Sequence, residues 1–294
     1  MNVLDTRFIA EASSNHAKDL DRALQLVAEA SNAGFDAIKF QLFRVDELFS
    51  VEILRNSPEH RARQDLELPV HFIPELSETA RELGLDFSCT PFALHSVEFL
   101  ASYVDFLKVA SYELLWDDLL RECASTGLPL VVSTGMADIG EIDHAIEVIW
   151  ANGCQDLTLL HCVSAYPTPI EDANLAAIAT LRTHTGIPIG WSDHTNEPAV
   201  IHRAVHRWGA TMVELHLDVD GQGAEFSPGH CWLPETAASL IRDLKMGGKA
   251  DGHGRKEPAA SELSDREWRA DPSDGLRPLV PERTRWLGSY SSHT

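Results

Sequence analysis

The chain has 294 residues, 44% of them hydrophobic and 23% charged, a composition typical of a soluble globular protein with one large domain or two small ones. Its formal net charge of −21 argues against nucleic acids and anionic membranes as partners. No run is long and apolar enough to span a membrane, and the N-terminus lacks the pattern of a signal peptide, so we expect a cytoplasmic protein. The five cysteines include no CxxC pair, which argues against a disulfide framework or a zinc knuckle.

Short apolar runs alternate with amphipathic segments along residues 1–250. The strand-like runs are 7–13, 37–43, 86–92, 106–111, 130–135, 157–164, 188–194 and 212–218. Helical patterns cover 17–33, 74–83, 138–151, 197–207 and 234–246. Eight strands that are nearly all apolar and alternate with helical segments predict an α/β fold, a (β/α)8 TIM barrel over residues 1–250, with a doubly wound sheet as the alternative.

Residues 251–294 differ in character from the rest of the chain. Gly, Pro, Arg and Asp become more frequent and the hydrophobic periodicity is lost. This composition predicts an irregular C-terminal arm, with Trp268, Leu276 and Trp286 as candidate anchors.

Polar side chains mark the carboxyl ends of the predicted strands, where TIM barrels carry their active sites. Helix capping alone would favour Ser, Thr, Asp and Asn at these positions, whereas two of the ends carry lysine and two carry histidine. The candidates are Glu11, Lys39, Gln41, Thr90, Lys108, Ser111, Ser133, Ser164, Tyr166, Ser192, His194, Glu214 and His216.

Two of the six lysines, Lys39 and Lys108, lie inside apolar strands. Burying an ammonium group without a partner is costly, so each needs a carboxylate or an anionic ligand. One interpretation is a salt bridge to Glu11 or Glu113. The other is that the lysines and the hydroxyls of the strand ends bind a trianion such as phosphoenolpyruvate.

His194 and His216 end two successive strands, and neutral imidazoles so placed suit Mn²⁺, Fe²⁺, Co²⁺ or Zn²⁺. The alternative is that both are core residues. His230 is a further ligand, a substrate contact or a loop histidine. The stretch after His194 also predicts a helix start, with Thr195 or Asn196 as N-cap and Pro198 in the first turn.

Glu11 and Glu113 lie near strand ends, where they can act as general acid or base, or can serve only as partners of the lysines.

Eight motifs in this order resemble the sialic acid synthase family, and the resemblance extends over about residues 7–262, including GRKEPAASEL. They are FIAEASSNH, AIKFQLF, SCTPF, LKVASYE, VVSTGM, LLHCVSAYPTP, GWSDHT and VELHLD. The family condenses phosphoenolpyruvate with an amino sugar on a (β/α)8 barrel. The resemblance implies a divalent metal, typically Mn²⁺, and a homodimer.

The resemblance also implies roles for individual residues. His194 and His216 would bind the metal, and Glu11 and Glu113 would take the catalytic positions. Phosphoenolpyruvate would be held by Lys39, Thr90 and Lys108 at its carboxylate and by Ser111, Ser133, Ser164 and Ser192 at its phosphate. The sugar side would be Gln41 and Tyr166, to which we add His230.

The sequence departs from the family in two places. The family's GPD turn is here Ser227-Pro228-Gly229, followed by His230. The family barrel usually precedes an antifreeze-like domain, for which residues 251–294 leave no room, so we expect its absence. The motifs for phosphoenolpyruvate are complete, whereas those for the acceptor are altered.

The function expected from these residues is condensation of phosphoenolpyruvate with an aldose, an amino or deoxy sugar. The product would be a nonulosonic-type 2-keto-3-deoxy sugar acid, with phosphate released by metal-assisted C–O cleavage. The alternatives are a metal-dependent pyruvate aldolase, another 3-deoxy-sugar-acid synthase on the same barrel, or a non-catalytic barrel subunit.

Overall fold

A computed structural model describes residues 6–290, with side chains described up to residue 286. The chain divides into two compact units, Met1–Ala250 and Asp251–Thr294. Among the described residues, no helix has the length and apolar character needed to cross a membrane.

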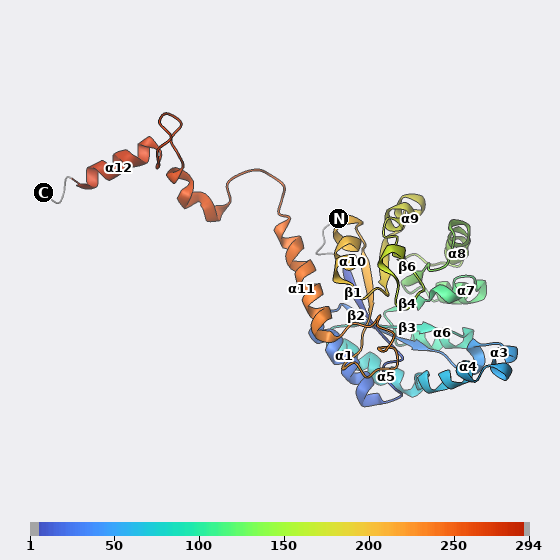
Figure 1. Cartoon of the computed structure of the whole chain (residues 1–294). Helices are drawn as coiled ribbons and strands as arrows, with labels where there is room; N and C mark the ends of the chain where they lie inside the picture. Colours follow the sequence, from blue (N-terminus) through green and yellow to red (C-terminus); the bar gives the residue numbers. More distant parts are fainter. Residues whose placement is uncertain (1–5, 291–294) are drawn as a thin grey trace. The chain divides into compact units, whose positions relative to one another are not determined.

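The first unit is built on eight parallel strands that close into a barrel in sequence order (Figure 1). They are β1 (Arg7–Ser13), β2 (Ala37–Leu42), β3 (Asp86–Pro91), β4 (Phe106–Val109), β5 (Leu130–Ser133), β6 (Leu157–Cys162), β7 (Ile189–Asp193) and β8 (Met212–His216). The ring closes between β8 and β1, where Glu11 is paired with His216. The predicted TIM barrel is confirmed, and the doubly wound sheet is excluded because the sheet has no edge strand.

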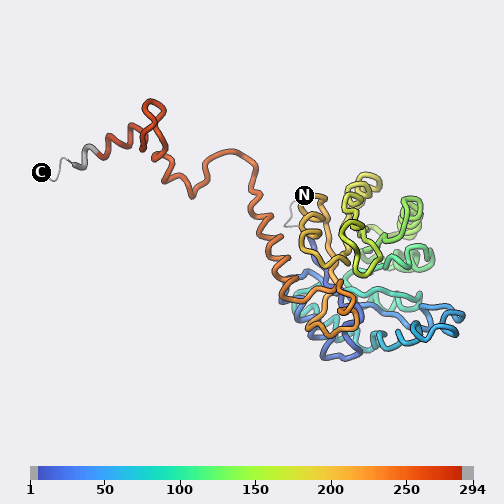
Figure 2. Tube along the Cα trace, in the orientation of Figure 1, coloured from blue at the N-terminus to red at the C-terminus, as the bar shows by residue number. Residues whose placement is uncertain are grey.

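Helices surround the strands, as the ribbon and the Cα trace both show (Figures 1 and 2). The α-helices of this unit are α1 (Leu20–Ala33), α2 (Val45–Leu48), α3 (Val51–Asn56), α4 (Pro58–Ala62), α5 (Ile73–Glu82), α6 (Leu94–Ala101), α7 (Asp117–Ser125), α8 (Ile139–Ala151), α9 (Ala177–Thr185), α10 (Pro198–His202) and α11 (Pro234–Ala250). Short 3-10 turns are η2 (Arg63–Leu66), η3 (Val70–Phe72), η4 (Ser111–Glu113) and η5 (Ile170–Asp172), and η6 (Arg203–Arg207) is a π-helical turn.

Local sequence explains where the longer helices begin and end. Asp19 caps α1 by accepting from the amide of Arg22, and Gly34 ends it with a φ of 86°, a left-handed conformation that favours glycine. Asp138 and Glu141 form a reciprocal capping box at the start of α8.

The barrel interior has an apolar layer beneath a polar one. Six buried side chains form the apolar layer, separate from the main core: Ile9, Ala37, Phe106, Val131, Leu160 and Met212. Two residues further along the same strands come Glu11, Lys39, Lys108, Ser133, Cys162 and Glu214. Because strand side chains alternate with a period of two, both sets point inward. The polar residues therefore lie on an apolar floor, toward the carboxyl ends of the strands.

The turn after β7 differs from the predicted helix start. The N-cap residue of α10 is Glu197, so the prediction of Thr195 or Asn196 was wrong, although Pro198 does occupy the first turn. The buried carboxylate of Asp193 accepts hydrogen bonds from the backbone N–H groups of Thr195 and Asn196. It also accepts from the indoles of Trp191 and Trp232. Asp193 therefore organises the turn and fixes the backbone on either side of His194.

The second unit contains η7 (Ala260–Trp268) and α12 (Val280–Tyr290). It is thus more regular than the irregular arm expected from composition. The rings of Trp268 and Trp286 meet edge to face at 6.0 Å, and Arg283 pairs with Asp274. These contacts link η7, α12 and the segment between them.

Gly190 lies within strand β7 and has no space for a side chain. A Cβ atom there would lie 2.5 Å from the Leu160 side chain and 2.5 Å from the Met212 carbonyl oxygen. We expect Gly190→Ala to lower the free energy of unfolding by about 1–3 kcal/mol, the usual cost of overpacking, in urea denaturation. Gly140→Ala, in α8 with its nearest neighbour at 3.4 Å, is the control and should be neutral or stabilising. Equal stability of the two variants would contradict the packing argument.

Candidate active site

Two lysines and two glutamates form the centre of the polar layer. Lys39 on β2 pairs with Glu11 on β1. Glu214 on β8 lies between the two lysines, with oxygens 3.7 Å from the Lys39 Nζ and 3.9 Å from the Lys108 Nζ. Each of the four residues is at most 4% exposed. The salt-bridge interpretation of the sequence therefore holds for Lys39 and Glu11, whereas Glu214 takes the place expected for Glu113.

The two ammonium groups keep donors for a ligand. Lys108 donates to the Ser133 hydroxyl at 2.7 Å and to the Val109 carbonyl at 3.2 Å. Lys39 uses one N–H on Glu11 and one on the Thr90 hydroxyl at 3.4 Å. Since an ammonium carries three N–H donors, each lysine has one left to bind an anion.

Electrostatics keep this centre charged. Burial disfavours ionisation of Glu214, but Lys108 and Lys39 outweigh it and hold the pKa of Glu214 below its ordinary value. Burial also lowers the pKa of Lys108, and Glu214 opposes that shift. For Lys39 the attraction of Glu11 and Glu214 exceeds the cost of burial, so its pKa is raised.

The predicted phosphate side surrounds Gly135, in the loop after β5. Its amide donates to the Ser111 hydroxyl at 2.9 Å. A Cβ at position 135 would lie 2.4 Å from the Ser164 hydroxyl and 2.8 Å from that of Ser111, so only glycine fits between them. The Ser164 hydroxyl is buried and has no hydrogen-bond partner, which leaves it available to a ligand. Ser192, the fourth predicted hydroxyl, donates instead to Glu214 at 2.9 Å.

Four rings gather at the ends of β6, β7 and β8. The centroid of His194 is 5.1 Å from that of His216 and 4.1 Å from that of Tyr166. His230 is 4.8 Å from His216, centroid to centroid. The Nδ1 of His194 lies 2.7 Å from the Val163 carbonyl, which makes that nitrogen the donor and leaves Nε2 with its lone pair. Burial lowers the pKa of His194 to about 3, so the ring is neutral, as a metal ligand must be.

Gln41 and Ser13 connect this group to the lysine centre. Gln41 donates to Glu11 at 2.8 Å and to the Ser13 hydroxyl at 3.2 Å. Ser13 donates to Glu225 at 2.6 Å. Glu225 in turn faces His216, with an oxygen 3.4 Å from its Nδ1. One continuous set of polar contacts thus runs from Lys39 to the histidines.

Glu113 lies in η4, just after β4. Burial raises the pKa of Glu113 to about 7, and the nearby Lys108 only partly offsets the effect. One of its oxygens is buried with no hydrogen-bond partner. A carboxyl group with a pKa near neutrality and an unused oxygen is suited to proton transfer. Glu11, bound by Lys39 and Gln41, is less free to do so.

Sequence reasoning left four residues of the site without a role: Ser13, Gly135, Glu214 and Glu225. A signal existed for Glu214, because it precedes His216 by two residues and therefore points to the same face of β8. Gly135 follows Ser133 by two residues for the same reason. Ser13 and Glu225 carried no such signal, because their contact joins segments 212 residues apart.

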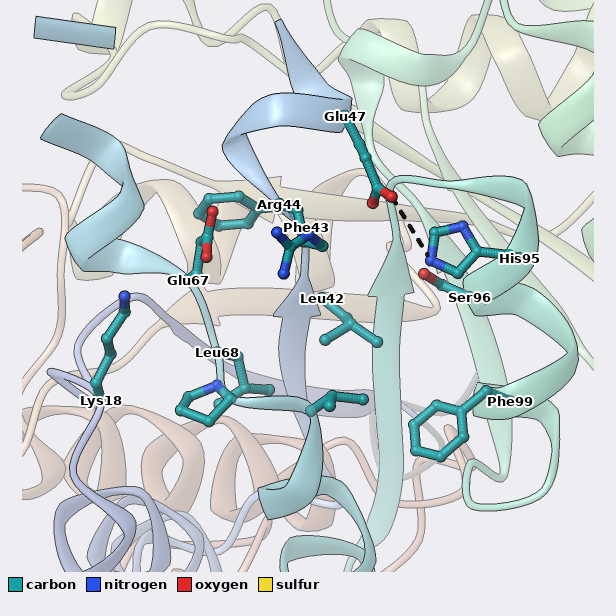
Figure 3. Close-up of a pocket in the computed structure, with 12 residues that line it drawn as sticks. Lys18, Leu42, Phe43, Arg44, Glu47, Glu67, Leu68, His95, Ser96 and Phe99 are labelled. Carbon is teal, nitrogen blue, oxygen red and sulfur yellow. Dashed lines mark ion pairs between the residues drawn. The ribbon is translucent and has the colours of Figure 1, made fainter. Parts of the chain in front are cut away.

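A pocket of about 390 Å³, distinct from the candidate active site, lies at the carboxyl end of β2. Figure 3 shows it between the segment that follows β2 and helix α6, with Lys18, Glu67 and Leu68 on one side and His95, Ser96 and Phe99 on the other. None of its lining residues belongs to the sequence-predicted site. Leu42 lines it, and this side chain points away from the barrel interior because its neighbour Gln41 points inward.

The model of the NeuB family matches residues 26–256. The chain belongs to the NeuB family. This NeuB chain is 40% identical to an uncharacterized protein of Methanocaldococcus jannaschii, over 98% of this chain and 82% of the other. It is 36% identical to the N,N'-diacetyllegionaminic acid synthase of Legionella pneumophila, over 87% and 76% of the two chains.

The solved structures include a close match to the whole fold. The N-acetylneuraminic acid (sialic acid) synthetase of Leptospira borgpetersenii, crystallised in complex with citrate, superimposes with a TM-score of 0.79 at 33% identity. The match covers 92% of this chain and 93% of the other. The sequence resemblance is thereby confirmed: the NeuB chain is a sialic acid synthase-like enzyme.

Glu214 offers a test of the charge balance in the lysine centre. Glu214→Gln keeps the shape of the side chain but leaves two buried ammonium groups with a single glutamate, Glu11, beside them. We expect the free energy of unfolding at pH 7 to fall by about 3 kcal/mol, the cost of breaking a buried ion pair, measured by urea denaturation. Because the pKa of Glu214 is lowered, its stabilisation is present above its ordinary value near 4.5, and the deficit should persist from pH 5 to 8.

The matched control is Glu147→Gln, an exposed position on α8, where a change within about 0.5 kcal/mol is expected. The charge balance would be contradicted if Glu214→Gln were as stable as this control.

Proposed function

We propose that the chain condenses phosphoenolpyruvate with an aldose, an amino or deoxy sugar, to a nonulosonic-type 2-keto-3-deoxy sugar acid and phosphate. The observation that carries the proposal is the pair Lys39 and Lys108, buried in the barrel with one unused N–H each. The relatives reported above, a legionaminic acid synthase and a sialic acid synthetase, support the same chemistry.

The donor substrate fits the charges and hydroxyls of the site. Phosphoenolpyruvate is a trianion with a carboxylate and a phosphate. In our proposal Lys39 and Thr90 bind the carboxylate, and Lys108 lies between the two anionic groups. Ser111 and Ser164, on either side of Gly135, bind the phosphate. Two ammonium groups and several hydroxyls supply the charge-assisted hydrogen bonds that such an anion needs.

The site residues also fit a divalent metal. The Nε2 of His194 keeps its lone pair because Nδ1 carries the proton, and the Nδ1 of His216 is buried without a hydrogen-bond partner, so both nitrogens can bind a metal ion. A divalent ion held by His194 and His216, which we take to be Mn²⁺, would supply Lewis acidity toward the aldehyde oxygen of the sugar. Gln41 and Tyr166 adjoin these groups and would orient the sugar. The homodimer and the cytoplasmic location implied at the sequence level belong to the same proposal.

The proposed reaction forms a bond between C3 of phosphoenolpyruvate and the aldehyde carbon. The lysines hold the donor so that the two carbons meet at a reactive distance. C2 becomes cationic, and the former aldehyde oxygen takes up a proton from solvent to become a hydroxyl. Water adds to C2, and Glu113 accepts one of its two protons. Collapse of this intermediate breaks the bond between C2 and the phosphate oxygen, the second water proton leaves with the phosphate, and C2 becomes the 2-keto carbon. Lys108 lies close to the Ser133 hydroxyl, on the predicted phosphate side, and to Glu214. In this proposal its ammonium group stabilises the charge on the departing phosphate.

Phosphate release tests the proposed function directly. Purified protein is incubated with phosphoenolpyruvate, Mn²⁺ and a panel of aldoses with and without N-acyl groups, and inorganic phosphate is measured. We expect release that depends on both phosphoenolpyruvate and at least one aldose, with formation of a 2-keto acid of matching mass. Condensation of pyruvate in place of phosphoenolpyruvate, without phosphate, would identify an aldolase and contradict the proposal.

The raised pKa of Glu113 leads us to expect a pH-dependent reaction rate. With a pKa raised to about 7, the carboxyl group is mostly protonated at pH 6 and mostly ionised at pH 8. Since the ionised form accepts the proton of water, we expect kcat/KM to rise through pH 7 and then level off. Glu113→Gln should lower kcat by about 10²–10⁴-fold and abolish the rise. The exposed Glu122→Gln serves as control, and an unchanged pH profile in Glu113→Gln would remove Glu113 from this role.

A further inference from the structure

The loop between β8 and α11, residues 217–233, brings two more potential donors to the histidines. The Oε2 of Glu225 lies 3.4 Å from the Nδ1 of His216 and 3.7 Å from the Nε2 of His230. His216 and His230 also lie in a group of three residues whose ligand atoms are all within 4.8 Å of one another, the third being Cys231. Three side chains from β8 and its loop therefore point to one small volume: His216, His230 and Glu225.

The ring nitrogens of His230 make no hydrogen bond within the described part of the chain, although the ring packs against His216 and Tyr166. It is 3% exposed, and both ring nitrogens are buried without a hydrogen-bond partner. A buried polar group left unsatisfied costs about 1–3 kcal/mol, so such a ring is uncommon unless a ligand completes it. The Nδ1 of His216 is buried and unsatisfied in the same way.

The spacing of these atoms suits donors that share one ion. Ligands bound at about 2.0–2.2 Å in tetrahedral or octahedral geometry lie about 3.0–3.6 Å from one another. The two distances from Glu225, 3.4 and 3.7 Å, are close to that range and longer than good hydrogen bonds. By contrast, Cys231 is occupied, since its Sγ lies 3.2 Å from the Glu225 carbonyl oxygen.

The fold fixes the position of Glu225. Asn15 accepts from its backbone N–H at 2.9 Å and donates to the Leu217 carbonyl at 2.9 Å. Asp218, paired with Arg22 at 2.7 Å, accepts from the Gly223 amide at 3.0 Å and so holds the preceding turn.

The two oxygens of the Glu225 carboxylate have different surroundings. Oε1 accepts from Ser13 at 2.6 Å, whereas Oε2 faces the histidines. Hydrogen bonds that orient a carboxylate toward an ion are the usual support of a metal ligand.

We propose that Glu225 and His230 are ligands of the divalent metal, together with His194 and His216, so that His230 binds the metal in place of the sugar contact expected from the sequence. Three imidazoles and one carboxylate suit Mn²⁺, Fe²⁺, Co²⁺ or Zn²⁺ and leave positions open for a reactant. The inference rests on the proposed function only in taking His194 and His216 as metal ligands. It adds that the loop after β8 supplies half of the protein donors.

Metal affinity tests the inference without reference to catalysis. We would measure the Mn²⁺ dissociation constant by isothermal titration calorimetry for the original chain, Glu225→Gln and His230→Asn. The exposed Glu171→Gln is the matched control. Loss of a ligand should raise the dissociation constant by about 100-fold or more, beyond the 10–100-fold of a supporting residue, while the control stays within twofold.

A second readout separates a ligand from an orienting residue. The visible spectrum of bound Co²⁺ depends on the atoms around the ion, so Glu225→Gln and His230→Asn should each change its bands. Glu225→Asp, which keeps the charge, should recover part of the affinity, and circular dichroism checks that each variant is folded. A variant that does not fold is replaced by Ser13→Ala, which frees the Glu225 carboxylate without removing it and should weaken Mn²⁺ binding.

Two results would overturn the inference. One is an Mn²⁺ affinity of both variants within twofold of the original chain. The other is weaker binding with an unchanged Co²⁺ spectrum, which would make the residues supports of the site. The proposed function fails separately, if the original chain binds Mn²⁺ but releases no phosphate with any aldose.

Discussion

Two ammonium groups inside a closed barrel are the constraint on which the rest of the structure depends. Lys39 and Lys108 are buried, so their charge must be balanced where they lie, and Glu11 and Glu214 provide the balance. Replacing such a set by well-packed apolar residues is often neutral or stabilising. An ion-pair network is therefore a poor means of holding a barrel together, and its placement above an apolar floor is better explained by the binding of an anion.

The proposed function requires an acidic chain to bind an anion. A net charge of −21 repels a trianion over most of the surface. The cations of the proposed anion site lie inside the barrel, where the effective dielectric is lower than in water and each attraction is stronger. Glu11 and Glu214 balance the charge of those cations, and Ser13 and Gln41 extend the same network to the histidines.

The barrel and most of the candidate site residues could be predicted from the sequence, because the side chains of a barrel strand alternate between the interior and the exterior. A period of two separates the inward side chains from the outward ones. Lys39 and Gln41 must therefore lie on the same side of their strand, as must Glu214 and His216. The predicted strand bounds agree with those of the structure to within two residues, because the apolar runs end where the polar loops begin. The family resemblance then assigned roles that periodicity alone had left open.

What the sequence could not provide were contacts made across long separations. The loop that carries Glu225 is positioned by Asn15 and Arg22, from the first strand–helix segment of the chain. The helix start after His194 was misplaced because Asp193, which looked like one more strand residue, turned out to accept the amides of the turn. Both are cases in which tertiary structure decides a local conformation.

Equilibrium binding of phosphoenolpyruvate tests the central claim, that the buried lysine centre is an anion site. Titration calorimetry would compare the original chain with Lys108→Met, which keeps much of the side-chain volume and removes the charge. The account predicts saturable binding at one site in the original chain. In the variant the affinity should fall by at least about 100-fold, since a buried charge-assisted contact of nearly 3 kcal/mol is lost. Equal affinity in the two proteins would contradict the account.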